Sequence, residues 1–178
     1  MPNLARGTAQ CSFDTGATYG TITPSIDTAN FNMSASDCVV ANKGDMFTLQ
    51  QTQGSLVVSF TSGSQARIGG AFFLLKSSAS VTLQANQEQY ICLTIDKGQQ
   101  DGYKADITLK SLSQIQRGAL YGGGSVRDLP IYKITASTST ITSITDMRKI
   151  VGNVYDVTES EYETLTKENY AIYNIYED

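Results

Sequence analysis

Short runs of alternating apolar and polar residues follow one another from residue 36 to residue 110, and turn residues separate them. Alternation with a period of two is the pattern of a strand that buries one face and exposes the other. Many short strands at this spacing, with Gly and Asn between them, predict an antiparallel β-sandwich or barrel. The strands expected in this region are 37–41, 45–51, 55–60, 66–68, 71–76, 80–84, 89–96 and 104–110.

A further hairpin is predicted at residues 129–150, which read LPIYKITASTSTITSITDMRKI. Strands at 129–135 and 140–145 flank a Ser/Thr-rich turn. Asp146 and Arg148 are two residues apart in an extended segment, so their side chains point to the same face and can form charge-assisted bonds with each other's neighbours. The alternative is an exposed pair that adds little stability.

The last 26 residues, NVYDVTESEYETLTKENYAIYNIYED, contain five of the ten tyrosines and seven of the 17 acidic residues. Thr158 and Glu161 form a capping-box pattern, which predicts a short helix after a strand, with Lys167 in its last turn and Asn169 at its end. A strand at 171–176 is expected to follow. A strand-helix-strand unit of about 25 residues is too small to stand alone, so it must pack on the domain or on a partner chain.

The chain length of 178 residues suits one domain with an appendage. We expect a flexible N-terminal arm at 1–22, a β-sandwich domain at 23–150 and a C-terminal β-α-β appendage at 151–178. The fold class predicted from these observations is mainly β.

The chain has no histidine, which removes the commonest general base and the commonest transition-metal ligand. Ser–His and Cys–His nucleophilic catalysis are therefore excluded within this chain. We expect no enzyme, no cofactor and no metal site. The scattered aspartates are expected to be solvated turn residues; they are Asp45, Asp96, Asp101, Asp106, Asp128 and Asp146.

An odd number of cysteines without a C-x-x-C spacing predicts buried free thiols at Cys11, Cys38 and Cys92. A disulfide between Cys11 and Cys38 is the alternative. The net charge of −4 and the lack of a Lys/Arg cluster argue against nucleic-acid binding. The longest apolar stretch, 71–75, is too short to cross a membrane, and the N-terminal residues lack the apolar core of a secretory signal, so synthesis in a cytoplasm is expected.

The 129–150 hairpin resembles one found in phage tail and baseplate proteins, where a strand of the type P-L-Y-K-V and a short turn precede I-T-S-I-x-D-x-R. The stretch ARIGGAFFLLKSSASVTLQANQEQYICLTID is similar to the strands that come before it in such proteins, and DVTESEYETLTKENYAIYNI resembles a second phage-tail module. The matching hairpin residues are Pro130, Ile131, Tyr132, Lys133, Ile134, Ile141, Thr142, Ser143, Ile144, Asp146 and Arg148.

Together these segments resemble the shoulder (N-terminal) domain of siphophage receptor-binding proteins, and the build is similar to that of a small Bacillus-phage baseplate protein. The resemblance implies a β-sandwich that forms homotrimers, docks on other baseplate proteins and is located in the virion after synthesis in the host cytoplasm. It implies a structural adaptor in which Asp146 and Arg148 fix the hairpin end against the linker to the C-terminal unit.

A carbohydrate-binding module that contacts host cell-wall saccharide is the alternative function, because aromatic side chains form platforms for sugars and tyrosines are plentiful. The same tyrosines also suit simple packing. The interface candidates are Asp146, Arg148, Tyr132, Tyr162, Tyr173 and Tyr176.

Overall fold

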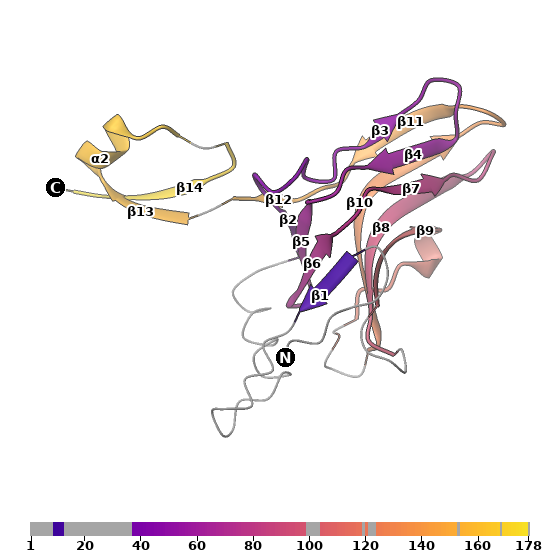
Figure 1. The fold of residues 1–178 in the computed structure, drawn as a ribbon, viewed down its shortest axis with the longest axis horizontal. Helices are drawn as coiled ribbons and strands as arrows, with labels where there is room; N and C mark the ends of the chain where they lie inside the picture. The colour runs from indigo at the N-terminus through magenta and orange to yellow at the C-terminus, as the bar shows by residue number, and fades with distance from the viewer. Residues whose placement is uncertain are drawn as a thin grey trace.

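The structure is a computed structural model of the chain. It describes residues 9–12, 37–98, 104–118, 120, 124–152, 154–167 and 169–177, with the backbone alone at 9–12 and 154–156. Within these ranges the protein is mainly β, with several antiparallel sheets, as the sequence predicted (Figure 1). No helix in them is long and apolar enough to cross a membrane.

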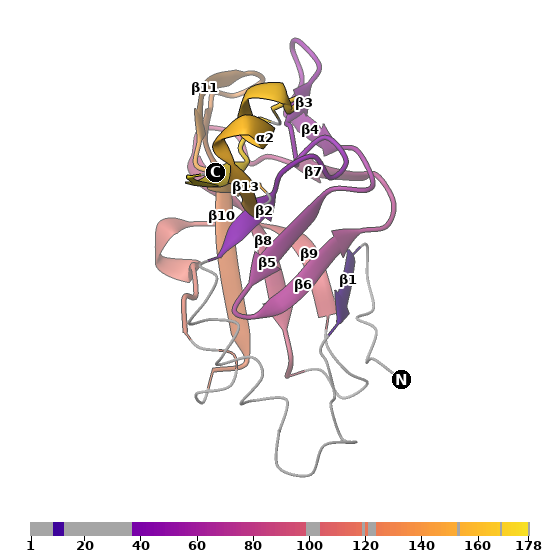
Figure 2. The ribbon, with the colours of Figure 1, turned by 90° about the vertical axis from the view of Figure 1, so that its left-hand side faces the viewer.

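One sheet has five strands. In spatial order these are β1 (Ala9–Ser12), β6 (Ala71–Leu75), β5 (Gln65–Ile68), β2 (Cys38–Val40) and β12 (Ile150–Val151). All neighbours in it are antiparallel except β12, which runs parallel to β2. Figure 2 shows β2, β5, β6 and β1 next to one another in front of β8 and β10. Strand β1 comes from the segment predicted to be a flexible arm, and the rest of that arm lies outside the described residues.

A second sheet has four antiparallel strands, and a third has three. The four are β11 (Ile141–Asp146), β10 (Val126–Ala136), β8 (Glu88–Asp96) and β9 (Lys104–Lys110), and the three are β3 (Gln50–Gln51), β4 (Val57–Phe60) and β7 (Ala79–Thr82). The predicted hairpin forms as β10 and β11. The register of β10 with β8 shifts between Pro130 and Tyr132. A bulge is where a central strand tolerates proline, which has no amide hydrogen to donate.

One apolar core joins side chains from these sheets. Alternation along β6 buries Phe73 and Leu75, and Ile91 in β8 and Ile131 in β10 belong to the same cluster. The ring of Phe47, from the loop before β3, packs edge to face on that of Phe73 with centroids 5.8 Å apart. The core therefore draws on segments that are far apart in the sequence.

The C-terminal elements form a small sheet of their own. Strands β13 (Val154–Thr158) and β14 (Ile172–Tyr176) are parallel, and helix α2 (Glu159–Thr164) connects them in the predicted order strand, helix, strand. We call residues 154–177 the C-terminal unit. Figure 1 shows it beyond β12, to one side of the other sheets, which with their loops we call the body.

The boundary of α2 differs from the prediction. The capping box of Thr158 and Glu161 forms, but the helix ends at Thr164, so Lys167 lies beyond its last turn. The residue in the left-handed region is Tyr170, with φ of 66°, and not Asn169. The six-residue helix buries no side chain.

Candidate functional site

The hairpin register brings three of the predicted residues together. Tyr132 in β10 lies opposite Asp146 at the end of β11. The Arg148 guanidinium forms a bidentate ion pair with the Asp146 carboxylate, with Nη2 2.6 Å from Oδ2 and Nε 2.9 Å from Oδ1. The backbone amide of Arg148 donates to the same carboxylate at 3.0 Å. Asp146 and Arg148 therefore bond to each other directly, which is the strong, oriented form of an ion pair.

Arg148 and Tyr132 also hold the loop that precedes β3. Nη1 of Arg148 donates to the Met46 carbonyl at 2.9 Å, and its guanidinium carbon lies 5.1 Å from the centroid of the Tyr132 ring. The Tyr132 hydroxyl donates to the Phe47 carbonyl at 3.1 Å and accepts from the Leu49 amide at 3.2 Å. We call this cluster of Tyr132, Asp146, Arg148 and loop 45–49 the Arg148 junction.

The loop in this junction was predicted to be part of a strand, and that prediction is wrong for residues 45–49. Met46 and Phe47 have φ of 56° and 55°, a left-handed conformation that no strand adopts. The Ser64 hydroxyl donates to Asp45 at 2.6 Å and accepts from the Phe47 amide at 3.0 Å. These bonds, and the burial of the Phe47 side chain, hold the loop in a conformation that its sequence alone disfavours.

Glycine is required beside this loop. Gly44 has φ of 58°, and a Cβ atom there would lie 2.4 Å from the Ser64 amide nitrogen. The close backbone approach brings Ser64 within reach of both Asp45 and Phe47. One oxygen of Asp45 is buried and has no hydrogen-bond partner among the described residues.

The electrostatics of the junction keep its ion pair charged. Burial of Asp146 by itself raises the pKa of the carboxyl, but the hydrogen bonds and charge of Arg148 outweigh it and leave the pKa below its ordinary value. The hydrogen bonds that Arg148 donates to Asp146 raise the pKa of Arg148. The pKa of Tyr132 is also raised, chiefly by burial. At neutral pH Asp146 and Arg148 therefore form an ionised pair suited to fixing the backbone.

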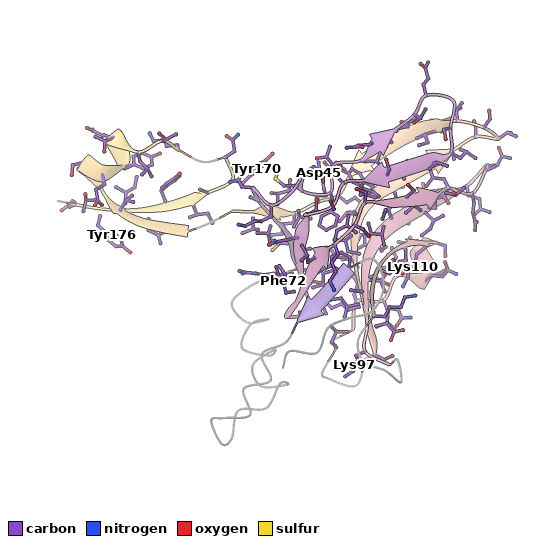
Figure 3. All side chains as sticks on the ribbon, in the orientation of Figure 1. Asp45, Phe72, Lys97, Lys110, Tyr170 and Tyr176 are labelled. Atoms are coloured by element: carbon purple, nitrogen blue, oxygen red, sulfur yellow. The ribbon has the colours of Figure 1, made fainter. Side chains whose placement is uncertain are left out.

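The junction continues into the C-terminal unit. Directly after Arg148, the amides of Val39 and Ala41 donate to the carbonyls of Lys149 and Val151 at 2.8 and 2.9 Å. The Gly152 amide then donates to the Tyr170 carbonyl at 3.0 Å. Figure 3 places Tyr170 where the C-terminal unit meets the body.

The other three predicted residues lie within the C-terminal unit. The rings of Tyr162 in α2 and Tyr173 in β14 pack edge to face with centroids 5.4 Å apart. The Lys167 ammonium lies 4.0 Å from the centroid of the Tyr162 ring. Tyr176 is 56% exposed. The structure thus brings three of the six candidates together at the junction and places Tyr162 and Tyr173 in contact in the C-terminal unit. Tyr176 lies at the end of β14.

Sequence reasoning missed a buried ion pair. Asp128, expected to be a solvated turn residue, lies in β10 with its side chain fully buried. Both of its oxygens are 2.7 Å from the Lys110 ammonium, and it also accepts from the Thr94 hydroxyl at 2.6 Å and the Gln116 amide at 2.7 Å. Its partners come from β8, β9 and the segment after η1 (Leu112–Gln114), so only the strand order could have revealed the cluster.

Two cysteines lie in the body as buried free thiols, as predicted; they are Cys38 and Cys92. The predictions for the Cys11 thiol, including the alternative disulfide with Cys38, concern a side chain outside the described residues. Burial, followed by the charge of Asp128, raises the pKa of Cys92 to about 12. A thiol with so high a pKa is almost wholly protonated at neutral pH and is a poor nucleophile.

A second arginine joins two sheets of the body. Nε of Arg127 donates to Asp37 at 2.8 Å, and Nη1 donates to the carbonyls of Arg117 and Gly118, each at 3.0 Å. The other Asp37 oxygen accepts from the Gly69 amide at 2.8 Å. Asp37 precedes β2 and Arg127 lies in β10, so this bond joins the five-stranded and four-stranded sheets.

A small polar pocket opens beside β8 and β9, with a volume of about 200 Å³. The Gln89 side chain is fixed there by bonds to the backbone of Gln84 at 2.9 and 2.8 Å. The residues that line the pocket are Gln84, Gln87, Gln89, Leu109, Lys110, Ser111 and Gln114. In the part of the chain that the structure describes, no group of three or more Cys, Asp or Glu side chains could hold a metal ion.

No protein family model matches the chain, and no curated protein matches it. The functional interpretation therefore depends on the sequence motifs and the geometry of the site.

Proposed function

We propose that the chain is a structural protein of a phage virion, a tail-tip or baseplate adaptor or shoulder module that acts through protein–protein contacts. In this proposal the sheets pack as an antiparallel β-sandwich, and the C-terminal unit is an appendage to it. Several antiparallel sheets that share one core support this arrangement. The resemblance of the hairpin and of the C-terminal segment to phage-tail proteins supports the role.

The Arg148 junction is the observation that carries the proposal. An adaptor must hold its two ends in a fixed relative orientation. The junction fixes the backbone where the chain leaves the body for the C-terminal unit. Arg148 bonds Asp146 and the Met46 carbonyl from a side chain that is only 12% exposed. Such a cluster orients the chain without needing a substrate, and the proposal assigns it no catalytic step and no cofactor.

Assembly is the second part of the proposal. The adaptor forms a homotrimer, binds other baseplate proteins and is located in the virion. Large exposed apolar side chains at the C-terminal unit, among them Ile172 and Tyr176, support a role in contacts with other chains.

Two measurements test this function. Gold-labelled antibody against the chain, viewed by electron microscopy on virions of the phage that encodes it, should mark the tail tip. Light scattering on a sizing column should give three times the monomer mass. Absence of the chain from purified virions would contradict the structural role, and a monomer at high protein concentration would contradict the trimer.

The polar pocket favours a second candidate function, binding of host cell-wall saccharide. Side-chain amides of Gln84 and Gln87 and the Ser111 hydroxyl border it, and Leu109 adds an apolar surface. Sugars are bound by such combinations of hydrogen-bonding groups and apolar contact. Titration calorimetry with purified cell-wall polysaccharide should release heat that Gln87→Ala and Ser111→Ala reduce. The absence of heat with the unsubstituted protein would eliminate this candidate.

A further inference from the structure

Exposed apolar side chains concentrate in the C-terminal unit. Nine large hydrophobic residues are substantially exposed in the described part of the chain, and five of them lie between residues 165 and 176. They are Leu165 at 39%, Tyr170 at 53%, Ile172 at 52%, Ile175 at 46% and Tyr176 at 56%. This segment holds more than half of these exposed side chains, so apolar exposure is concentrated in the C-terminal unit and not spread over the described surface.

The two faces of the sheet in this unit differ. Tyr173 of β14 packs against Tyr162 of α2, so the helix covers part of that face, on which Ile175 is 46% exposed. Alternation along the strand turns Ile172 and Tyr176 to the opposite face, and Figure 3 shows Tyr176 on the side away from α2. Parallel sheets are normally larger than two strands and covered on both faces. Among the described residues both β13 and β14 are edge strands.

The charge of the unit limits what can cover this face. Residues 154–178 contain seven acidic residues and one basic residue, whereas the rest of the chain has ten acidic and 12 basic residues. Exposed carboxylates of Glu159 and Glu163 lie on α2, on the helix side of the sheet. Two copies of the unit would repel each other, whereas a basic partner would be attracted.

We propose that the C-terminal unit binds an extended, basic segment of another protein, which adds a strand to the edge of the β13–β14 sheet. Alternate side chains of that strand would be apolar and cover Ile172 and Tyr176. The others would be Lys or Arg and would lie on the helix side, near Glu159 and Glu163. Strand addition supplies affinity through the backbone, and the alternating side chains supply specificity. The inference rests on the proposed adaptor function and names the kind of partner that this end of the adaptor holds.

The test uses the full chain and a synthetic peptide of about ten residues, the length of a long strand, in which lysine alternates with valine. A matched peptide has glutamate in place of lysine. Fluorescence anisotropy should show binding of the lysine peptide that is about tenfold or more tighter than that of the glutamate peptide. Binding should weaken as sodium chloride is raised from about 50 mM to about 500 mM.

Two variants locate the site. Ile172→Ser should weaken binding of the lysine peptide about tenfold, and Glu159→Gln with Glu163→Gln should reduce its salt dependence. Leu112→Ser is the matched control, because Leu112 is 68% exposed in η1, a segment of the body. Circular dichroism should show that every variant keeps the β spectrum of the parent.

Equal binding of the two peptides, no binding of either, or equal affinity of Ile172→Ser and Leu112→Ser would overturn the inference. These failures are distinct from failure of the proposed function. A chain that is present in virions but does not discriminate between the peptides keeps its adaptor role and loses this site. A chain that binds the lysine peptide but is absent from virions keeps the site and loses the role.

Discussion

Strand β10 of the body and strand β14 of the C-terminal unit have similar side chains in opposite environments. In β10, Ile131 and Ile134 are fully buried and Tyr132 is 4% exposed. In β14, Ile172 is 52% and Tyr176 is 56% exposed. The residues are similar but their surroundings differ. Strand β10 lies between two strands and shares the apolar core with other sheets, whereas among the described residues β14 has one neighbouring strand and a short helix. Apolar strands therefore form a core only where the fold supplies further layers.

The two regions also use charge differently. In the body, Asp128 and Lys110 are paired inside the sheet, with side chains 0% and 15% exposed. In the C-terminal unit the carboxylates of α2 are exposed. Buried pairs constrain a fold because each partner depends on the other, whereas exposed charges act at longer range on other molecules. The body thus has a charge pair that contributes to its internal order, whereas the carboxylates of α2 face solvent.

The largest effect should come from the buried ion pair. Replacing Asp128 with Ala leaves the Lys110 ammonium without its partner, and the free energy of unfolding should fall by about 4 kcal/mol. Glu163→Ala, at an exposed carboxylate of α2, should change it by less than about 0.5 kcal/mol. Urea unfolding at neutral pH measures both. Similar losses of unfolding free energy for the two variants would contradict the difference that we infer between the buried and the exposed charges.

The same substitution at two isoleucines tests the packing difference. Ile131→Ala removes buried methyl and methylene groups from the core, and we expect a loss of about 3 kcal/mol. Ile172→Ala should cost less than about 0.5 kcal/mol in the isolated protein. Urea unfolding measures both, and a loss above about 2 kcal/mol for Ile172→Ala would show that β14 is already buried against another part of the assembly in solution.

Arg148 lies where the chain leaves the body for the C-terminal unit, so its replacement should affect both regions. Lysine keeps the charge but cannot form a bidentate pair with Asp146 and donate to the Met46 carbonyl at the same time. Arg148→Lys should therefore lower the free energy of unfolding by about 2 kcal/mol. Lys133→Ala breaks an exposed pair with Glu88, 2.9 Å apart, and serves as the control with a small expected effect. Hydrogen exchange should also become faster around Gly152 in Arg148→Lys. Unchanged exchange there would mean that the junction does not reach the C-terminal unit.

The capping box offers a smaller, local test. The Thr158 hydroxyl accepts from the Glu161 amide, and the Glu161 carboxylate accepts from the Thr158 amide. Thr158→Ala should destabilise α2 by about 1 kcal/mol. Hydrogen exchange of the α2 amides should report this, while urea unfolding of the body stays unchanged. A matching loss in the body would show that both regions unfold as one cooperative unit.

The smallest effect should appear in acid. The pKa of Asp146 is lowered in the folded protein, so its contribution to stability is present above the ordinary value of about 4 and is lost as the pH falls through the lowered pKa. The stability difference between the parent and Asp146→Asn should therefore shrink between pH 7 and pH 3. Urea unfolding at the two pH values measures it. A stability difference that instead grows as the pH falls would mean that folding raises the pKa of Asp146.

Strands with regular alternation could be predicted from the sequence, and the long-range polar contacts could not. The hairpin was expected at 129–135 and 140–145 and is found at Val126–Ala136 and Ile141–Asp146. Its alternation is a local signal, and so is the capping box at Thr158. The partnership of Asp128 with Lys110 spans 18 residues and depends on β9 and β10 lying on either side of β8, which no local pattern encodes.

The Arg148 junction was predictable in part. The spacing of Asp146 and Arg148 indicated a shared face, and the hairpin register explains why Tyr132 joins them. The loop at 45–49 was predicted to be part of a strand because it lies within a region whose apolar residues recur with a period near two. Its left-handed residues are stabilised by Ser64 and by the Tyr132 hydroxyl, which lie 17 and 85 residues from Phe47. Tertiary contacts here override the local preference of the backbone.

The parallel pairing of β12 with β2 has a mechanical consequence. A force that pulls the C-terminal unit away from the body along the chain passes through residues 149–151, and their hydrogen bonds to Val39 and Ala41 would be loaded together, in shear. The ion pair of Arg148 and Asp146 lies just before this segment and would be loaded after these hydrogen bonds break. Resistance to pulling is set by the rate of unfolding and not by equilibrium stability. A chain with a weak C-terminal unit can therefore still transmit tension through a short, well-anchored strand.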